Sequence, residues 1–557
     1  MINGEEKLIS KIFFRMTKRY KRHLVVIFLL VMVSFGLSLI SPRIESKIID
    51  RGILSGDLKN LVFLVVFVIF IKLSYECVTF AQNYLKTILN IDIREEMSIK
   101  AFNHILRLKI QYIKKYGLYK IVKDVDYELT MITQIFGDQI IECLFELTKI
   151  IGYFVGLMFI NWKLTLFVVI LMPFKYVVSK IINGIRERNF EKLLIIQKKI
   201  SEWQSNIFDG IYEIKLWNLY RKQEQKYSEL LRESNSIVKS INILDGLDSL
   251  INNVAESIIF NLLYIIGGIF IWKNYLTLGE IIAFITFSQY LFQPISVLLQ
   301  FKATIAETLP AFRSFLHFLK MEEENIYGSV NVKKVNSIEF RDVTFSYGNE
   351  LILNRISFTI HKGEKVIITG KNGSGKSSIL ALLLRYYEPD SGQILINDID
   401  ISRIPIDKYR MLFSCVSQDV FLFNDTIKNN VFMDIEQGCE MNKHKQLLSF
   451  IDKFEEKEDK IVGKNGIYLS GGEKQRIAFA RCISKNAEIL LADEVTSNCD
   501  VACKKEIQDI LENSKFNIIF LITHDRHIFS DFQKIIVIEN GRIIAIGTYE
   551  EVNKFLN

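Results

Sequence analysis

Apolar and polar positions are distributed unevenly along this chain. Long runs with few charges are concentrated before about residue 315, and the composition after that point is more polar. A helix that crosses a bilayer needs about 20 apolar residues, and the first run is long enough with its flanks. The pattern therefore predicts six membrane-spanning helices, at about residues 24–40, 61–81, 141–160, 164–178, 255–272 and 278–300.

The intervals between these runs alternate between very short and very long. Residues 161–163 are typical of a tight turn, whereas the intervals at 82–140 and 179–254 are long and rich in charge. Small cytosolic domains are the alternative for the long intervals, but strand alternation and clustered turn residues are missing from them. We therefore expect helices that continue past the bilayer into the cytosol. Short crosswise helices that touch the second domain are expected at 112–118 and 210–218.

Charge and cysteine content narrow the class of protein. The net charge is +7, but much of the basic excess flanks apolar runs, where positive residues mark the cytosolic side of a membrane. We therefore expect no nucleic-acid partner, and a multi-pass protein of the cell membrane with both termini in the cytosol. The seven cysteines are scattered without a CxxC pair, which argues against a metal site or a disulfide framework.

A glycine-rich stretch at residues 370–377 lies between a strand pattern and a helix pattern, with the spacing of a phosphate-binding P-loop. The glycines let backbone N–H groups turn toward the β- and γ-phosphates of ATP, while Lys376 adds positive charge and Ser377 is placed to ligate Mg²⁺. We expect the nucleotide to contact Gly370, Asn372, Gly373, Ser374, Gly375, Lys376, Ser377 and Ser378.

Two further strand patterns end in groups suited to phosphate chemistry. The apolar pattern at 489–494 ends in Asp493, placed to hold Mg²⁺ through water, and Glu494, the candidate base that orients the attacking water. A second apolar strand pattern ends at Leu521-Ile522. His524 follows it and is a candidate contact to the γ-phosphate of ATP. A lone histidine is more often structural, but this one shares its strand-end position with the other groups.

A second glycine-rich helix start occurs at Ser470, Gly471 and Gly472, and such a helix end also binds anions. One ATP cannot use two such helix ends in a single small domain. The economical interpretation is that these three residues close over the ATP that Lys376 of another copy holds.

Together these motifs make the chain similar, over essentially its whole length, to exporter-type half-transporters of the ABC family. The stretch Leu469-Ser470-Gly471-Gly472 is the most specific of them. The resemblance implies a membrane all-α, six-helix transmembrane domain with long cytosolic helical extensions at 1–319 and a linker at 320–336. An α/β P-loop ATPase domain of ABC type is then expected at 337–557.

The resemblance also implies roles for individual residues. Tyr347 is similar to the aromatic residue that stacks on adenine, and Gln418 to the glutamine that senses Mg²⁺ and contacts the membrane domain. Catalytic roles are implied for Glu494, His524 and Gln418, and Mg²⁺ contacts for Ser377, Gln418 and Asp493.

Three positions depart from the family pattern. Glu473 stands where glutamine is commoner, Asn498-Cys499 replace the usual Ala-Leu of the D-loop at 497–500, and Lys464 stands where exporters usually carry a glutamate. The first change is expected to be benign. The other two put in doubt how the two halves communicate.

These features predict an ATP-driven exporter that works as a homodimer and alternates between inward-facing and outward-facing states. Six spans exclude a soluble ABC ATPase, and their fusion to one ATPase domain disfavours an importer. A regulatory or channel-like ABC membrane protein and one half of a heterodimeric exporter remain alternatives. Few residues precede the first span, so no N-terminal peptidase domain is expected.

Charged residues inside the predicted spans favour an amphiphilic cargo, whether peptide, lipid or drug-like. Such residues are costly in lipid and usually face a bundle interior or water. They are Lys72, Glu76, Glu142, Glu146, Lys149, Lys175 and Glu256. We expect them to line a hydrated cavity open to the cytosol. The alternative is that they pair across helices or lie at the headgroup level.

Overall fold

The computed structural model describes residues 19–135, 139–326, 328–433, 448–495, 501–513 and 515–555. The chain divides into two compact units. The first comprises Met1–Leu106 and Tyr119–Met321, and the second Arg107–Leu118 and Glu322–Asn557. The second unit therefore includes a short insert from the helical part of the sequence.

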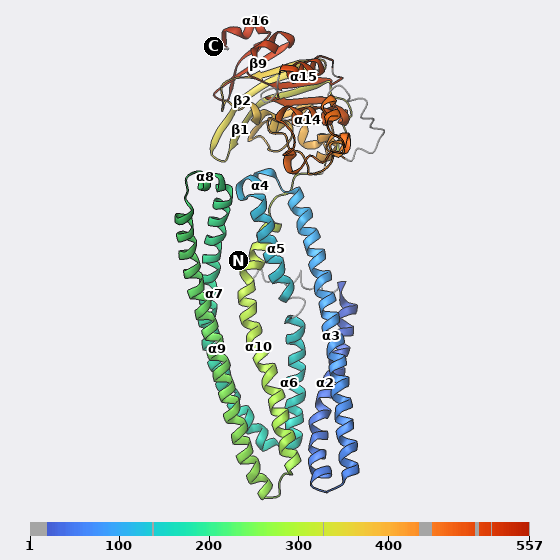
Figure 1. Cartoon of the computed structure of the whole chain (residues 1–557), viewed down its shortest axis with the longest axis vertical. Helices are drawn as coiled ribbons and strands as arrows, with labels where there is room; N and C mark the ends of the chain where they lie inside the picture. The colour runs from blue at the N-terminus through green and yellow to red at the C-terminus, as the bar shows by residue number, and fades with distance from the viewer. Residues whose placement is uncertain are drawn as a thin grey trace. The chain divides into compact units, whose positions relative to one another are not determined.

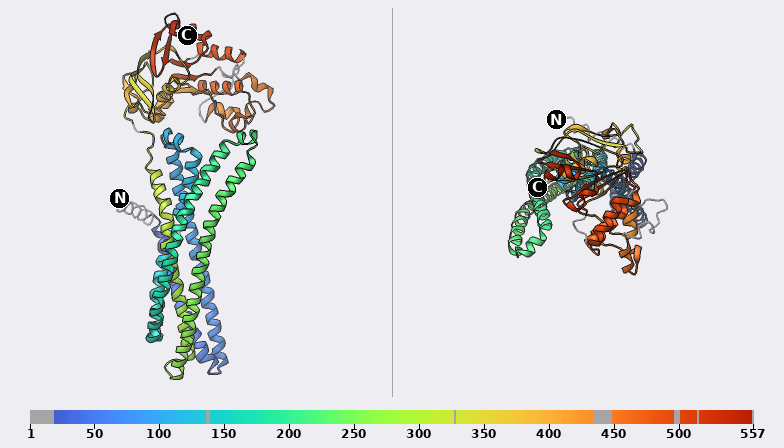
Figure 2. Two further views of the ribbon diagram at one scale, coloured as in Figure 1. Left: turned by 90° about the vertical axis from the view of Figure 1, so that its left-hand side faces the viewer. Right: turned by 90° about the horizontal axis from the view of Figure 1, so that it is seen from above.

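The first unit consists of long helices, coloured from blue to yellow-green in Figure 1. They are α2 (Lys21–Lys47), which runs into the π-helix η1 (Ile48–Ile53), α3 (Leu58–Arg107), α5 (Leu118–Gln134), α6 (Ile140–Ile160), α7 (Trp162–Asp209), α8 (Ile211–Leu216), α9 (Tyr220–Trp272) and α10 (Leu278–Leu319). Helices α7 and α9 lie side by side and are joined at one end by the short α8 (Figures 1 and 2).

These helices are longer than a bilayer crossing requires. The 48 residues of α7 span about 70 Å at 1.5 Å per residue, against about 30 Å for a hydrocarbon core. Asn161 starts α7 as its cap, because its side-chain oxygen accepts hydrogen bonds from the backbone N–H groups of Lys163 and Leu164. Thr277 and Glu280 form a capping box at the start of α10. These caps define two of the tight turns between the long helices.

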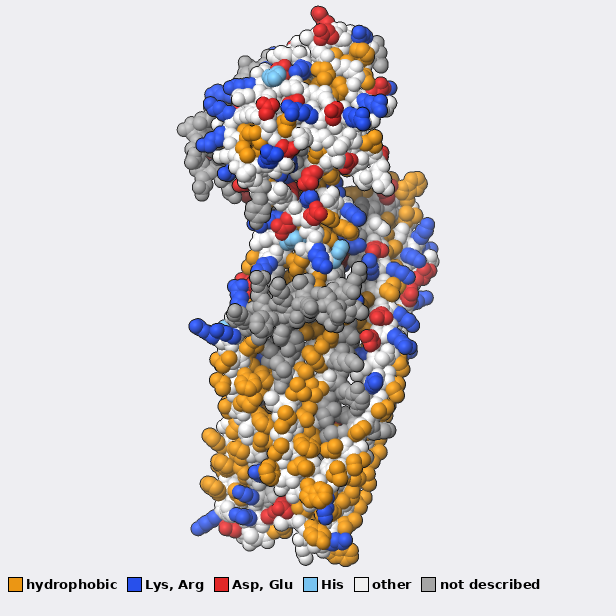
Figure 3. All heavy atoms as spheres, turned by 180° about the vertical axis from the view of Figure 1, so that it is seen from behind, with side chains coloured by type: hydrophobic (Ala, Val, Ile, Leu, Met, Phe, Trp, Pro, Cys, Tyr) orange, Lys and Arg blue, Asp and Glu red, His pale blue; other side chains and the backbone are white. Residues whose placement is uncertain are grey.

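By length and composition, three stretches among the described residues suit a membrane crossing: Lys21–Ile53, Leu58–Arg107 and Tyr220–Trp272. The other predicted runs lie on α6, α7 and α10, and Leu278–Phe292 forms a shorter apolar helix. Figure 3 shows apolar side chains covering a broad band of this unit. Exposed apolar side chains such as Phe159 and Trp272 fit a lipid environment rather than water.

A core of apolar side chains holds several of these helices together. Helix α10 packs against α6, α2 and α7. Leu157 of α6, Val168 of α7, Leu263 of α9 and Phe287 of α10 are almost fully buried in one cluster. Some polar side chains of the bundle form hydrogen bonds with one another, as described below.

The second unit contains two sheets. A four-stranded antiparallel sheet has the order β2 (Glu350–His361), β1 (Ser337–Tyr347), β4 (Ser391–Ile396) and β5 (Ile399–Asp400). A six-stranded sheet has the order β10 (Arg542–Gly547), β9 (Lys534–Glu539), β3 (Lys365–Thr369), β8 (Ile518–Ile522), β7 (Ile489–Asp493) and β6 (Phe413–Val416). All pairs in the second sheet are parallel except β10 with β9.

Helices accompany the six-stranded sheet: α11 (Lys376–Leu383), α12 (Ile406–Met411), α13 (Ile427–Phe432), α14 (Gly471–Lys485), α15 (Val501–Asn513) and α16 (Tyr549–Val552). The continuous apolar runs of β3 and β8 are explained by this cover, because both faces of these strands are buried. The buried strands give a rigid edge on which polar loops can be placed.

The predicted linker at 320–336 is largely part of the second unit. Val332 and Val335 are buried in its core, and Glu323 forms an isolated antiparallel bridge with Leu108. The insert carries the short helix α4 (Ile110–Tyr116), which overlaps one predicted crosswise helix, and α8 overlaps the other. At these residues the predicted linker is therefore packed and hydrogen-bonded within the second unit.

Candidate nucleotide site

The predicted nucleotide groups gather at one edge of the six-stranded sheet. Strands β3, β8, β7 and β6 are consecutive parallel neighbours, so their carboxyl ends lie together. The P-loop follows β3, and His524 follows β8. Asp493 ends β7, Glu494 comes directly after it, and Gln418 follows β6. Ligands of open parallel sheets bind at this edge. The topology thus unites groups that lie far apart in the sequence.

The P-loop adopts a backbone that depends on its glycines. Gly370, Gly373 and Gly375 have φ values of +146°, +80° and +102°. A Cβ atom on Gly370 would lie 2.0 Å from the Ile538 carbonyl oxygen, so this position cannot accept a side chain. At Gly373, no heavy atom of the described residues other than the chain neighbours lies within 4 Å of the corresponding position. The loop is therefore packed tightly at its first glycine and open at Gly373, where a phosphate can approach.

Lys376 is folded back over this loop. Its Nζ atom donates hydrogen bonds to the carbonyl oxygens of Gly370, at 2.8 Å, and Lys371, at 3.0 Å. Burial lowers the pKa of Lys376, and the nearby carboxylates of Glu494 and Asp493 oppose this shift. The ammonium is thus held in a partly desolvated place where a phosphate would be a stronger partner than two carbonyls.

The hydroxyl of Ser374 is buried, and it makes no hydrogen bond within the part of the chain that the structure describes. Buried polar groups are normally hydrogen-bonded. A phosphate oxygen in the loop would satisfy this hydroxyl. The loop therefore fits a phosphate group on grounds independent of its sequence pattern.

Ser377, in the first turn of α11, and Asp493, at the end of β7, are brought together. Burial raises the pKa of Asp493, the hydrogen bond from Ser377 lowers it, and the neighbouring Glu494 raises it again. Mg²⁺ in nucleotide sites prefers oxygen ligands and usually takes one or two protein groups in addition to phosphate and water. The Ser377 hydroxyl and the Asp493 carboxylate fit such an ion.

Glu494 is held by two neighbouring loops. The Nε2 atom of Gln418 donates to Glu494 Oε2 at 3.1 Å, and His524 Nε2 lies 3.5 Å from Glu494 Oε1. The backbone of Glu494 has φ +46°, a left-handed conformation that strains a residue with a side chain. Its N–H donates to the carbonyl of Ile522 at 2.9 Å. The fold thus orients this carboxylate at the expense of local backbone strain.

Tyr347 ends β1 and remains 38% exposed. Its ring makes edge contacts with Phe345 and Tyr387, with centroids 4.8 and 5.0 Å apart. Phe345 is paired with Leu353 of β2, and a Cβ atom on Gly375 would lie 2.5 Å from the Leu353 side chain. The aromatic group is therefore near the P-loop and has surface available for stacking.

Ser470 caps α14. Its hydroxyl accepts from the backbone N–H of Glu473 at 3.4 Å, and its own N–H donates to Glu473 Oε2 at 2.8 Å. Burial would raise the pKa of Glu473, but the bond from Lys453 and the bond from the Ser470 backbone lower it overall. This departure from the family pattern has a structural role, since Glu473 closes the capping box. Ser470 and Gly471 are exposed at the helix start, and Gly472 is partly exposed.

The two other departures from the family pattern lie outside the group of strand-end residues. Lys464 is exposed in a short 3₁₀ helix (Lys464–Gly466), and the D-loop at 497–500 lies outside the described residues. Sequence reasoning missed Tyr387 and Lys114, which adjoin Tyr347. No local pattern marks them, because the contact joins segments distant in the chain.

The charged residues of the predicted cargo path are placed in several ways. Lys72 of α3 pairs with Glu45 of α2 at 2.9 Å, and Lys149 pairs with Glu146 of α6 at 2.6 Å. The remaining described residues of the set are at least partly exposed: Glu76, Glu142 and Glu256. The side chain of Lys175 lies outside the described residues. Cross-helix pairing, the alternative to a cavity lining, is thus observed at Lys72.

Two family models match the chain. The model for the ABC transporter transmembrane region matches residues 24–295, and the ABC transporter model matches residues 353–497. The two regions occur in the order expected of a transmembrane domain followed by an ATPase domain.

Similar proteins extend over almost the whole chain. An ATP-dependent lipid A-core flippase from Coxiella burnetii is 28% identical, covering 91% of this chain and 87% of that protein. An uncharacterised ABC transporter ATP-binding protein from Bacillus subtilis is 26% identical, covering 95% and 89%. A solved structure of a bacterial Atm1-family ABC exporter with ATP bound has the same fold, with a TM-score of 0.81, 23% identity and 97% of each chain covered. The predicted fold class is confirmed, and the chain belongs to the ABC transporter family as an exporter-type half-transporter that hydrolyses ATP.

Proposed function

We propose that two copies of this chain form a homodimer that uses MgATP hydrolysis to export a lipid-like amphiphile by alternating access, with both termini in the cytosol. The observation that carries this proposal is the grouping of Lys376, Asp493, Glu494 and His524 at adjacent strand ends of one chain. A homodimer would need no other subunit to repair an ATP site.

Each group has a distinct part in the proposed hydrolysis. Lys376 and the P-loop N–H groups bind the phosphates, and Ser377, Asp493 and Gln418 would hold Mg²⁺, which when bound offsets phosphate charge. Glu494 orients the attacking water, and Gln418 and His524 position its carboxylate through the contacts described above. Tyr347 stacks on adenine.

Two copies are required because α14 presents a second anion-binding helix end. Ser470 and Gly471 are exposed at that end, which suits closure over the nucleotide of a partner. Large apolar side chains are also exposed at the tip of the α7–α9 pair, including Tyr212 and Trp217. In the second unit Tyr468 is exposed as well. Contact with a second copy would bury surfaces of this kind.

The helical unit holds hydrogen-bonded polar groups within its apolar packing. Gln82 donates to the Ser34 hydroxyl at 2.8 Å in a buried position, and the Tyr153 hydroxyl donates to Ser38 at 2.9 Å. Polar groups inside an apolar bundle suit a cargo with a polar head and apolar tails. The lipid A-core flippases among the relatives support a lipid-like cargo in particular.

A lipid translocation assay tests this function. The purified chain is reconstituted in vesicles with a fluorescent phospholipid, and the fraction moved between leaflets is measured with and without MgATP. We expect ATP-dependent movement by the wild type and none by Glu494→Gln. Active ATP hydrolysis without movement of any lipid probe, together with stimulation by a soluble peptide alone, would contradict a lipid-like cargo.

Helix α6 supplies a matched pair of variants for the cargo path. Glu146 is buried and paired with Lys149, whereas Glu142 lies one turn away and is exposed. If the buried carboxylate contacts cargo, Glu146→Gln lowers lipid-stimulated ATPase activity while basal activity stays unchanged, and Glu142→Gln changes neither. Loss of folded protein with unchanged stimulation per folded molecule would mean that Glu146 is structural.

A further inference from the structure

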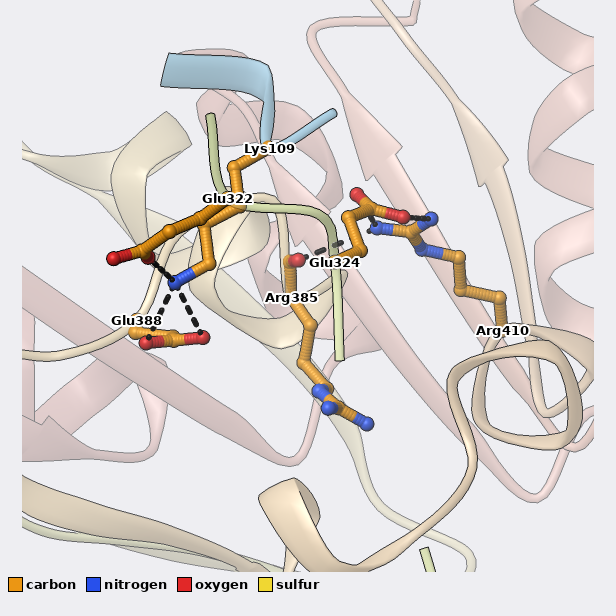
Figure 4. Close-up of polar contacts among 6 residues, drawn as sticks. All are labelled: Lys109, Glu322, Glu324, Arg385, Glu388 and Arg410. Carbon is orange, nitrogen blue, oxygen red and sulfur yellow. Dashed lines mark hydrogen bonds and ion pairs between the residues drawn. The ribbon is translucent and has the colours of Figure 1, made fainter. Parts of the chain in front are cut away.

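The start of the short helix α4 and the segment beside it are fastened to the rest of the second unit by three ion pairs, which we call the clasp (Lys109, Glu322, Glu324, Glu388 and Arg410). Lys109, just before α4, lies 2.8 Å from a Glu322 oxygen and 3.4 Å from a Glu388 oxygen (Figure 4). Backbone bonds reinforce it, since the Lys109 N–H donates to the Glu322 carbonyl at 3.2 Å. The start of α4 is thus held in place.

The second half of the clasp is a two-pronged ion pair. Both terminal nitrogens of Arg410 donate to the Glu324 carboxylate at 2.7 Å (Figure 4). Arg410 also donates through Nε to the Leu384 carbonyl at 3.1 Å. Bidentate pairs of this kind restrict orientation as well as distance. The segment that runs beside α4 is therefore tied to the body of the ATPase fold.

A cavity of about 930 Å³ adjoins the clasp. Its lining includes the aromatic residues Phe345, Tyr347 and Tyr387, together with Lys114 and Lys115 of α4. The Lys114 Nζ atom lies 5.9 Å from the centre of the Tyr347 ring and 5.5 Å from that of Tyr387. Both distances are within the range of a cation–π contact. Lys115 instead lies over the ring of Tyr116, at 5.2 Å.

We propose that Lys114 and the adenine of ATP compete for the Tyr347 ring, so that Lys114 sets nucleotide affinity and reports adenine binding to α4. This inference rests on the proposed role of Tyr347 in stacking on adenine. In this proposal adenine stacks on the face of the Tyr347 ring that Lys114 covers, and that face cannot hold both occupants at once. Because Tyr347 already makes edge contacts with Phe345 and Tyr387, the surface left for either occupant is limited.

Displacement of Lys114 has a direct structural consequence. Helix α4 is joined through the chain to α3 on one side and α5 on the other. The clasp holds the beginning of α4, whereas Lys114 is in its last turn. Adenine binding would therefore free the end of α4 that leads to α5 while its start stays anchored.

The competition is tested by equilibrium binding to the full chain in lipid discs, with EDTA present so that hydrolysis does not intervene. The probes are ATP and inorganic triphosphate, which has no base. Lys114→Ala is expected to tighten ATP binding about two- to fivefold, the range that an exposed cation–π contact supports. Triphosphate binding should stay unchanged. Lys114→Arg, which keeps the cation, should behave like the wild type.

Two further variants distinguish competition for the Tyr347 ring from a general effect of positive charge. Lys115→Ala removes the same charge from the adjacent position and should leave ATP affinity unchanged if competition, rather than general charge, is responsible. Tyr347→Ala should weaken ATP binding and abolish the effect of Lys114→Ala. Equal or weaker ATP binding by Lys114→Ala, with Tyr347→Ala still harmful, would overturn the competition and leave the proposed function intact. No effect of Tyr347→Ala would overturn the adenine assignment and the inference together.

Discussion

The Nε2 atom of His524 lies 3.5 Å from Oε1 of Glu494, across the carboxyl ends of two adjacent parallel strands. The Glu494 backbone is itself bonded to Ile522, the last residue of the strand that precedes His524. The two side chains are therefore positioned by one rigid strand pair. This arrangement suits the role proposed for Glu494, because a carboxylate that orients the attacking water must point in a fixed direction.

His524 is expected to contribute to hydrolysis rather than to ATP binding. His524→Ala should lower the turnover rate by about 100-fold, the lower range for a positioned proton-transfer or orienting group, with ATP affinity nearly unchanged. His527→Ala is the control, because His527 is exposed on the adjacent turn. Steady-state ATPase assays measure both. Similar turnover by the two variants would show that His524 is only structural.

The clasp is expected to stabilise the ATPase unit. Arg410→Ala removes a partly buried bidentate pair and leaves the Leu384 carbonyl without this donor, a loss of about 2 kcal/mol. The apparent Tm of the full chain should fall by about 4 to 8 °C. Arg341→Ala is the control, since Arg341 pairs with Glu339 at an exposed position and such pairs contribute at most about 1 kcal/mol. Equal shifts for both variants would contradict the role of the clasp.

Glu128 of α5 predicts a pH dependence of stability. Burial raises the pKa of its carboxyl to about 7 from 4.5, the hydrogen bond with Ser314 of α10 lowers it, and Asp124 raises it. One carboxyl oxygen, Oε2, is buried without a hydrogen-bond partner among the described residues. The folded state therefore favours the protonated form. The associated stability is fully present below about pH 4.5 and is lost as the pH rises through about 7.

Glu128→Gln tests this dependence, because glutamine cannot lose a proton. The variant should be more stable than the wild type at pH 8 and should show a smaller fall in Tm between pH 6 and 8. Asp126→Asn, on the same helix at an exposed position, should leave the pH profile unchanged. A wild-type profile that is flat across this range would rule out a raised pKa.

Much of the grouping at the candidate ATP site could be predicted because its signals are local. The P-loop has a fixed spacing, and Asp493, Glu494 and His524 each end a short apolar strand pattern. The parallel sheet then makes their meeting necessary, since the ends of neighbouring parallel strands lie at one edge. The long helices were predictable for a similar reason, because apolar runs and charged helical intervals leave a periodic pattern.

Contacts between distant segments could not be predicted in this way. Lys72 and Glu45, or Glu324 and Arg410, carry no sign of their partners in the sequence around them. Long charged side chains occur at many helix positions, so register and packing decide which pairs form. The polarity of the segment at 320–336 similarly predicts a linker, whereas Val335 is fully buried.

We propose above that this chain alone builds working ATP sites in a homodimer. It is tested by the ATPase activity of the purified chain in lipid vesicles, comparing wild type with Glu494→Gln, with ATP binding measured on the same samples. We expect turnover by the wild type without any other subunit, and a decrease of at least about 100-fold in Glu494→Gln with binding retained. Wild-type activity that arises only after a different half-transporter is added, or near-normal hydrolysis by Glu494→Gln, would contradict it.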